Sequence, residues 1–331
     1  MIGTHRKAVL GFWEGLPQVQ KDLEKVSEVL QNLSARLPSS LVHTLQEPLK
    51  HLLRRPGKGL RPALLLQAAR FGGLEDRHYT LAAGLELLHL ATLVHDDIVD
   101  GSPLRRGEPS FHAQKGISQG VLYGDLLFSL CFDLVGESST RENSRHLARM
   151  VTFMAGAEII QDQDRYTLPT SRRRILKRMT GKTGALFALS LFVGASESGI
   201  RGTDLDKFRR LGYHLGLAFQ LQDDILDFEG PPELLGKPTL SDLVQGHFTL
   251  PVHLALKKDP TLAQDLLHIN SEPEISHSVY QKLIKLDAMV ESRHLLSQRT
   301  LVIKSLLNQL PVAKEPHQLP EVIEKILGRK L

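Results

Sequence analysis

Apolar residues recur at spacings of three and four along most of the 331-residue chain, the pattern of helices that bury one face. Residues 16–37 show it clearly, and Pro38 ends that segment. No run of alternating β-branched residues interrupts the pattern. The sequence therefore predicts an all-α fold. The length alone allows one domain or two, and the even composition favours a single domain over residues 1–331.

The same spacing predicts further helices along the chain. Their expected ranges are 41–53, 64–71, 121–135, 148–161, 185–194, 215–228, 242–257, 262–269, 279–310 and 320–327, with another that ends at Asp100.

Composition excludes several classes of protein. The net charge of +4 comes without a basic block, which argues against nucleic-acid binding. Cys131 is the single cysteine, so no intrachain disulfide forms, and its apolar surroundings predict core packing. The first residues lack a secretory segment, and no apolar run approaches the roughly 18 to 20 residues that a bilayer span needs. We expect a cytoplasmic protein.

Three carboxylates end the apolar helix of residues 85–100. Asp96 and Asp100 lie four residues apart and share a face, with Asp97 beside them. Clustered anions at a helix C-terminus repel one another and oppose the helix dipole, so they favour a bound cation. Hard oxygen ligands of this kind suit Mg²⁺, which keeps waters and takes substrate phosphates. The alternative is a solvated acidic helix end.

A second copy of the pattern decides between these alternatives. Asp223, Asp224 and Asp227 also end an apolar helix, and a loop rich in Gly and Pro follows. Two such ends facing each other would form a carboxylate-lined, metal-closed site for a diphosphate.

Basic residues accompany the acidic motifs. Lys58 and Arg61 precede or begin a helix whose free N–H groups favour an anion, although loop cations are often only solvated. Arg105 and Arg106 follow the first motif closely, where they could grip a diphosphate or pair with the aspartates themselves. The segment 181–184 reads GKTG, but the strand and upstream glycine of a P-loop are missing.

The ordered set of motifs resembles the trans-isoprenyl diphosphate synthases, the polyprenyl synthetase family. The resemblance covers almost the whole chain. It comprises GKxxRP at 57–62, the two DDxxD motifs with Leu104-Arg105-Arg106-Gly107, and the dipeptides Gly124-Asp125, Lys182-Thr183, Phe219-Gln220 and Gly236-Lys237.

The resemblance implies a fold and a set of site residues. The fold would be a bundle of about ten or more helices around a deep central cavity, working as a homodimer. Three Mg²⁺ ions would be held by Asp96, Asp100 and Asp223, with Asp97, Asp224 and Asp227 nearby. The allylic diphosphate would bind Arg105, Lys182 and Lys237, and isopentenyl diphosphate would bind Lys58, Arg61, His89 and Arg106, with Thr183 and Gln220 at the reacting centre.

The implied reaction adds one isoprene unit per cycle. The allylic carbon–oxygen bond ionises, the isopentenyl double bond attacks the cation, and a proton is lost to the released pyrophosphate. Product length would be set just before Asp96, where Ala91 and Thr92 stand in place of bulky aromatic residues, with Phe128 and Phe132 as candidates for a deeper floor. In having small residues there, the sequence resembles enzymes that make long quinone side chains. Release of such a product would involve transient membrane association.

Two departures from the family pattern concern one loop. His247 stands where the family commonly has lysine, and residues 238–242 lack the usual glycine. These changes leave one diphosphate contact and the role of His247 open.

Four alternatives compete with a long-chain synthase. A terpene cyclase would usually replace the second DDxxD motif, and a non-catalytic subunit tends to lose aspartates, so the intact motifs argue against both. A short-chain farnesyl or geranylgeranyl synthase and a large catalytic subunit that needs a small partner stay open.

Overall fold

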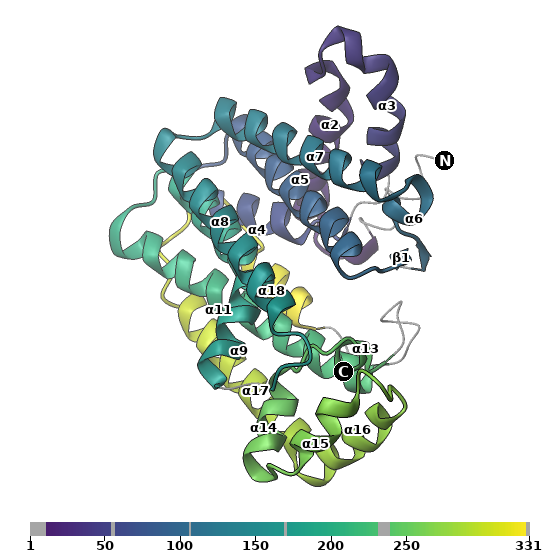
Figure 1. Ribbon diagram of the computed structural model, residues 1–331. Helices are drawn as coiled ribbons and strands as arrows, with labels where there is room; N and C mark the ends of the chain where they lie inside the picture. Colours follow the sequence, from purple (N-terminus) through teal and green to yellow (C-terminus); the bar gives the residue numbers. More distant parts are fainter. Residues whose placement is uncertain (1–10, 54–56, 106, 169–170, 231–238, 329–331) are drawn as a thin grey trace. The chain divides into compact units, whose positions relative to one another are not determined.

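The computed structural model describes residues 11–53, 57–105, 107–168, 171–230 and 239–328, and it excludes the side chains of Lys182 and Thr183. Almost every described element is a helix (Figure 1). The all-α prediction is confirmed. The described strands are β1 (Leu104–Arg105) and β2 (Glu108–Pro109), a two-residue antiparallel pair that the sequence pattern did not indicate.

The helices follow one another through short connections. In the first half they are α2 (Pro17–Gln31), η1 (Asn32–Arg36), α3 (Ser39–Leu53), α4 (Leu60–Ala69), α5 (Asp76–Val99), α6 (Phe111–Lys115), α7 (Ile117–Ser138) and α8 (Arg141–Gln163). In the second half they are α9 (Arg172–Met179), the π-helical turn η2 (Thr180–Gly184), α10 (Ala185–Glu197), α11 (Gly202–Glu229), α13 (Ser241–Val244), α14 (Leu250–Lys258), α15 (Leu262–His268), α16 (Ile275–Lys285), α17 (Ala288–Leu307) and α18 (Leu319–Leu327).

Contacts group the chain into two compact units. The first unit comprises Met1–Leu147, Leu189–Arg209 and Leu310–Ile326, and the second comprises Ala148–Ala188, Arg210–Gln309 and Leu327–Leu331. Neither unit is continuous in sequence, and boundaries between them fall within α8, α10, α11 and α18. The expectation of one domain over residues 1–331 stays a prediction.

The first unit is built on the long contact between α5 and α7, which lie side by side in Figure 1. Gly124 makes the close approach feasible, because a Cβ there would lie 2.0 Å from the imidazole Nε2 of His95. Leu87, Leu88 and Leu127 are fully buried, and burial of each such side chain stabilises the fold by about 1.5–3 kcal/mol.

A buried carboxylate joins three helices of the same unit. Glu197, at the end of α10, accepts hydrogen bonds from Asn143 Nδ2 at 2.6 Å and from Ser139 Oγ at 2.6 Å, and it pairs with Arg77 Nη1 at 2.8 Å. Burial alone would raise the pKa of Glu197, but these hydrogen bonds outweigh it and the pKa is lowered.

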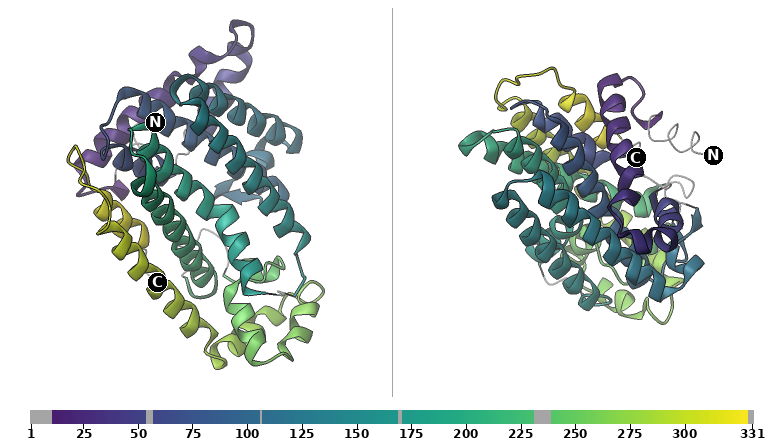
Figure 2. Two further views of the ribbon diagram at one scale, coloured as in Figure 1. Left: turned by 90° about the vertical axis from the view of Figure 1, so that its left-hand side faces the viewer. Right: turned by 90° about the horizontal axis from the view of Figure 1, so that it is seen from above.

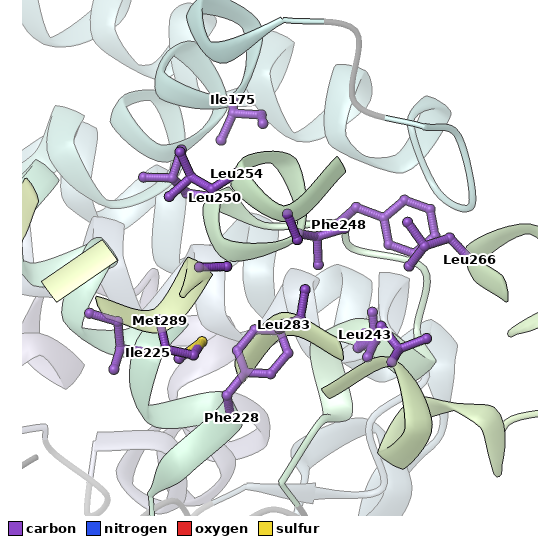
Figure 3. Close-up of a cluster of buried hydrophobic side chains, with 14 of the residues drawn as sticks. Ile175, Ile225, Phe228, Leu243, Phe248, Leu250, Leu254, Leu266, Leu283 and Met289 are labelled. Atoms are coloured by element: carbon purple, nitrogen blue, oxygen red, sulfur yellow. The ribbon is translucent and has the colours of Figure 1, made fainter. Parts of the chain in front are cut away.

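The second unit has its own apolar core beneath the end of α11. Ile225 and Phe228 of α11 belong to the same buried cluster as Leu243, Phe248 and Leu283 (Figure 3). The short helices α14, α15 and α16 pack together around this cluster and form a compact group in Figure 2.

Two predicted helices are wrong in extent. Residues 242–257 form α13 and α14 rather than one helix, because Gly246 between them adopts a left-handed φ of 77°. Residues 279–310 divide into α16 and α17 at Asp287, whose φ is 55°. The break at Asp287 has no proline, whereas Pro251 in the first turn of α14 marks a helix start that the apolar spacing alone did not show.

One prediction about membranes also needs correction. Among the described helices, α7 is long and apolar enough to cross a bilayer by length and composition. It nevertheless packs along α5, as the core helix of a soluble protein does, and it carries Asp125 and Asp133.

Candidate active site

The first aspartate motif lies at the end of α5 in the first unit. Asp97 is buried, whereas Asp96 and Asp100 are half-buried. The helix stops here because Gly101 turns left-handed with a φ of 60°, and Ser102 N then donates to the Asp97 carbonyl at 2.9 Å. The turn leaves all three carboxylates at one helix end, as the spacing predicted.

Arg105 reaches back from the β1–β2 hairpin to this motif. Its Nη1 pairs with Asp97 Oδ1 at 3.1 Å, which is the ion pair that the sequence left open. Burial raises the pKa of Asp97 to about 6, and Arg105 opposes this while Asp96 adds to it. An acid with a raised pKa beside other carboxylates is typical of a site that takes a cation. Arg106 lies outside the described residues.

Lys58 and Arg61 lie at the start of α4, as predicted. Gly59 forms the turn with a left-handed φ of 64°, and a Cβ there would approach Leu23 to 3.0 Å. The Lys58 carbonyl accepts from Trp13 Nε1 at 2.6 Å, and its ammonium lies 4.5 Å from the centre of the Phe12 ring. The backbone around Lys58 is therefore fixed, while its side chain is exposed.

His89 and the two proposed length-setting residues lie on α5. His89 and Thr92 are half-buried, and Thr92 Oγ1 donates to the His89 carbonyl at 2.8 Å. Ala91 is 0% exposed, so no water-sized space adjoins its methyl group. Thr92 is therefore the better candidate to face a growing chain.

Phe128 and Phe132 form an aromatic row with His95. The ring of Phe128 lies 5.6 Å from that of His95 and 6.4 Å from that of Phe132. Phe132 is 46% exposed. The row follows one side of α7, at the contact with α5.

The second aspartate motif lies at the end of α11 in the second unit. Gln220 Nε2 donates to Asp224 Oδ1 at 2.9 Å. Asp224 is only 2% exposed, and its Oδ2 accepts no hydrogen bond from any described residue. Burial raises its pKa to about 8, although the bond from Gln220 opposes the shift; Asp242 and Asp223 raise it further. Asp223 is half-buried beside it.

Asp227 differs from Asp223 and Asp224 in that it is hydrogen-bonded to the segment that follows α11. Its Oδ1 accepts from Ser241 Oγ at 2.8 Å and its Oδ2 accepts from Asp242 N at 3.1 Å. Leu240 N also donates to the Asp227 carbonyl at 2.7 Å. Asp227 therefore anchors the start of α13, and both of its oxygens are already in use.

Lys182 and Thr183 fall within the π-helical turn η2. Their side chains lie outside the described part of the structure, but the backbone places them between α9 and α10. Gly216 of α11 allows close packing here, because a Cβ on it would lie 2.3 Å from the Gly184 Cα. Single π-helical turns of this kind are frequent at functional sites. Lys237 also lies outside the described residues.

The donor atoms fit a hard divalent cation that is completed by other ligands. Within the described ranges, no three His, Cys, Asp or Glu side chains are grouped so as to hold a metal by themselves. Carboxylates at each motif with an unused buried oxygen at Asp224 instead match Mg²⁺, which takes few protein ligands and keeps water or phosphate oxygens.

Several residues around the second motif carry no sequence signal of their role. Ser241 and Asp242 hold Asp227, and Arg178 of α9 donates to the Phe248 carbonyl at 2.8 Å. No motif marks these residues, because their roles depend on contacts between distant segments.

Helices that end in paired aspartate motifs, with a basic turn before α4, define an all-α protein of the isoprenoid synthase type. The polyprenyl synthetase family model matches residues 42–286. The chain belongs to this family and is a prenyltransferase, as the motifs implied.

Relatives and solved structures agree with this assignment. The chain is 36% identical over 295 residues to heptaprenyl diphosphate synthase component 2 of Geobacillus stearothermophilus, covering 88% of this chain and 90% of the relative. Its structure resembles heptaprenyl diphosphate synthase of Staphylococcus aureus with a TM-score of 0.86 and 28% identity, covering 94% of this chain and 98% of the other. It also resembles a polyprenyl synthase of Caulobacter crescentus complexed with calcium and isoprenyl diphosphate, with a TM-score of 0.83, 30% identity and 94% coverage of both chains.

Proposed function

We propose that the chain is a Mg²⁺-dependent elongating synthase that condenses isopentenyl diphosphate with an allylic diphosphate of the farnesyl or geranylgeranyl type. The product is a long all-trans polyprenyl diphosphate for a quinone side chain. The observation that carries this proposal is the buried carboxylate in each motif, Asp97 and Asp224, whose raised pKa reflects charges that burial disfavours. A bound cation relieves that cost.

The metal ligands follow from the same residues. Asp96, Asp100 and Asp223 are the proposed direct ligands of three Mg²⁺, with Asp97 and Asp224 beside them. Asp227 acts by holding the chain after α11, because both its oxygens accept protein hydrogen bonds. When bound, the cations would neutralise charge on the departing diphosphate.

The cations of the chain divide between the two substrates. Arg105, Lys182 and Lys237 bind the allylic diphosphate, and Lys58, Arg61, His89 and Arg106 bind isopentenyl diphosphate. Gln220 orients Asp224 and, with Thr183, borders the reacting carbon. Arginine forks and lysine ammonium groups bind phosphate oxygens by charge-assisted hydrogen bonds.

The reaction balances without an external reagent. The allylic carbon–oxygen bond breaks and its electron pair leaves with the pyrophosphate. The isopentenyl double bond supplies the pair for the new carbon–carbon bond, and the pyrophosphate takes the proton that is then lost. Positioning of the two substrates supplies much of the acceleration.

Product length is set on α5 and α7. We assign the first limit to the face of Ala91 and Thr92 and a deeper floor to Phe128 and Phe132. The half-buried Thr92 and the exposed Phe132 ring support these positions, whereas the full burial of Ala91 gives it a packing role.

The enzyme works in the cytoplasm as a homodimer and meets the membrane only to release product. Support for self-association comes from exposed apolar residues of α7, Val121 and Leu122. Such a surface is commonly covered by a partner.

A second candidate is a catalytic subunit that needs a small partner. The name of the Geobacillus relative, component 2, favours it. Assaying the purified chain alone separates the two candidates.

The test of the proposal is pyrophosphate release from farnesyl and isopentenyl diphosphates. We expect release that requires both substrates and Mg²⁺ and that stops with EDTA. Full release of pyrophosphate in EDTA would refute the proposal. So would the absence of release from folded protein, both alone and after addition of a cell extract that has no synthase activity of its own.

A further inference from the structure

The segment that carries His247 is held by the region between α8 and α9. Tyr166 N donates to the Gly246 carbonyl at 3.0 Å, and Tyr166 Oη donates to the Val244 carbonyl at 3.0 Å. Arg178 Nη2 donates to the Phe248 carbonyl at 2.8 Å. Gly246 cannot be replaced without movement, because a Cβ on it would lie 2.7 Å from the Tyr166 ring. Residues 244–248 therefore have one favoured conformation.

Arg178 is the charged member of this set. Its side chain is only 13% exposed, and its described ion pair is a long one, 3.7 Å from Nη1 to Asp164 Oδ2. Asp164 is already bound by Arg174, whose Nε donates at 3.0 Å. Burying a guanidinium in so weak a pair costs stability, because the desolvation of the ion is not recovered.

The surroundings of Arg178 indicate what it serves. Burial lowers its pKa, while the carboxylates of Asp164 and Asp224 raise it, so the charge of the second aspartate motif acts on the guanidinium. Asp224 belongs to α11, and Phe248 follows His247 directly. The guanidinium is thus hydrogen-bonded to the loop and lies within electrostatic reach of the motif.

We propose that Arg178 is a positioning residue of the allylic diphosphate site, which fixes the segment 244–248 through Phe248 and keeps a permanent positive charge near Asp224. The inference rests on the proposed function. Arg174 supplies a matched control, because it lies one turn earlier on the same helix, shares Asp164 and is 51% exposed, but has no described contact with the loop.

The kinetic test compares Arg178→Gln, Arg178→Lys and Arg174→Gln. The bond from Arg178 to Phe248 lies within the protein, so its loss acts on binding through the order of residues 244–248; a bond from a charged donor is worth about tenfold in an equilibrium of this kind. We expect Arg178→Gln to raise the KM for the allylic substrate about tenfold and to change the KM for isopentenyl diphosphate little. Arg178→Lys keeps the charge but loses the planar fork, so it should recover part of the loss. Arg174→Gln should behave like the wild type.

Amide hydrogen exchange of residues 244–249 in the free protein gives a readout without turnover. Arg178→Gln should speed exchange there, because local opening no longer breaks the bond to Phe248. Tyr166→Phe, which loses the Val244 bond and no charge, should speed exchange with a smaller effect on the allylic KM. Equal effects of Arg178→Gln and Arg174→Gln, or equal changes in both substrates' KM, would overturn the inference.

Failure of the proposed function is distinguishable from failure of this inference. If the wild type turns over no substrate, calorimetry with Mg²⁺ and inorganic pyrophosphate replaces the kinetics. Weaker pyrophosphate binding in Arg178→Gln than in Arg174→Gln, with faster exchange, would still support the role. Unchanged binding and exchange would exclude it.

Discussion

Gln220 Nε2 lies 2.9 Å from Asp224 Oδ1, one helical turn away on α11, and leaves the other carboxylate oxygen of Asp224 buried without a described donor. This hydrogen bond joins the Phe219-Gln220 dipeptide to the second DDxxD motif, which the sequence presents as separate motifs. The amide orients one oxygen, and the second has no donor among the described residues, which is the arrangement expected of a carboxylate that lies beside a bound cation.

The aspartates of the second motif should separate by their effects on stability. Asp227→Ala removes the acceptor for Ser241 Oγ and Asp242 N, so it should lower the free energy of unfolding by about 1–3 kcal/mol. Asp223→Ala should leave stability nearly unchanged and lower turnover by orders of magnitude. Urea unfolding and pyrophosphate release measure the two effects. Near-normal turnover in Asp223→Ala would contradict the assignment of this residue to the metal.

Glu197 should make stability depend on pH. Its folded-state pKa is lowered from the ordinary value of 4.5, so its charge stabilises the fold above that value and this contribution is lost as the pH falls through the folded pKa. Glu197→Gln should therefore destabilise by about 1–3 kcal/mol at pH 7, and by progressively less as the pH falls below 4.5 toward the folded pKa. Unfolding measured at pH 7 and across the acid range, with the exposed Glu28→Gln as control, tests this. If the loss of stability in Glu197→Gln were independent of pH, the charge of Glu197 would contribute nothing to the stability of the network.

Cys131 should be unreactive in the folded protein. It is fully buried, and burial raises the pKa of its thiol to about 12. Because the thiolate is the reactive form, labelling with a chromogenic disulfide should be slower than for glutathione by orders of magnitude and should become fast in denaturant. One cysteine in the chain makes the signal unambiguous. Rapid labelling of the native protein would contradict the core position.

The two length-setting candidates should respond differently to a new ring. Ala91→Phe places a ring where no space adjoins the methyl group, so it should cost about 1–3 kcal/mol of stability. Thr92→Phe, on a half-buried side chain, should shorten the products and retain the first condensation. Product chromatography and thermal unfolding of both variants measure this. Unchanged product length in Thr92→Phe would remove residue 92 from the tunnel.

The helices and the acidic motifs could be predicted because they depend on local spacing. Residues 96–100 end α5 at a glycine, as the pattern indicated, and the burial of Cys131 followed from its neighbours. The break at Asp287 could not, because a single left-handed residue leaves the apolar spacing intact, whereas Pro251 at the start of α14 could have indicated the break near Gly246.

Leu240 shows how tertiary contacts override a local rule. It stands in the segment that lacks the usual glycine, and it still adopts a left-handed φ of 62°. That conformation costs a residue with a Cβ about 1–2 kcal/mol. Its side chain is buried in the cluster with Leu243 and Phe248, which offsets the cost. The role of Arg178 could not be predicted for a related reason, because its partners Phe248 and Asp164 lie in other segments.

The most direct test of the account is the length distribution of products from purified protein, labelled isopentenyl diphosphate, farnesyl diphosphate and Mg²⁺. The account predicts all-trans products that extend beyond geranylgeranyl diphosphate and end at a discrete length. Products that stop at geranylgeranyl diphosphate, or a folded protein that incorporates no label even with a small partner subunit added, would contradict it.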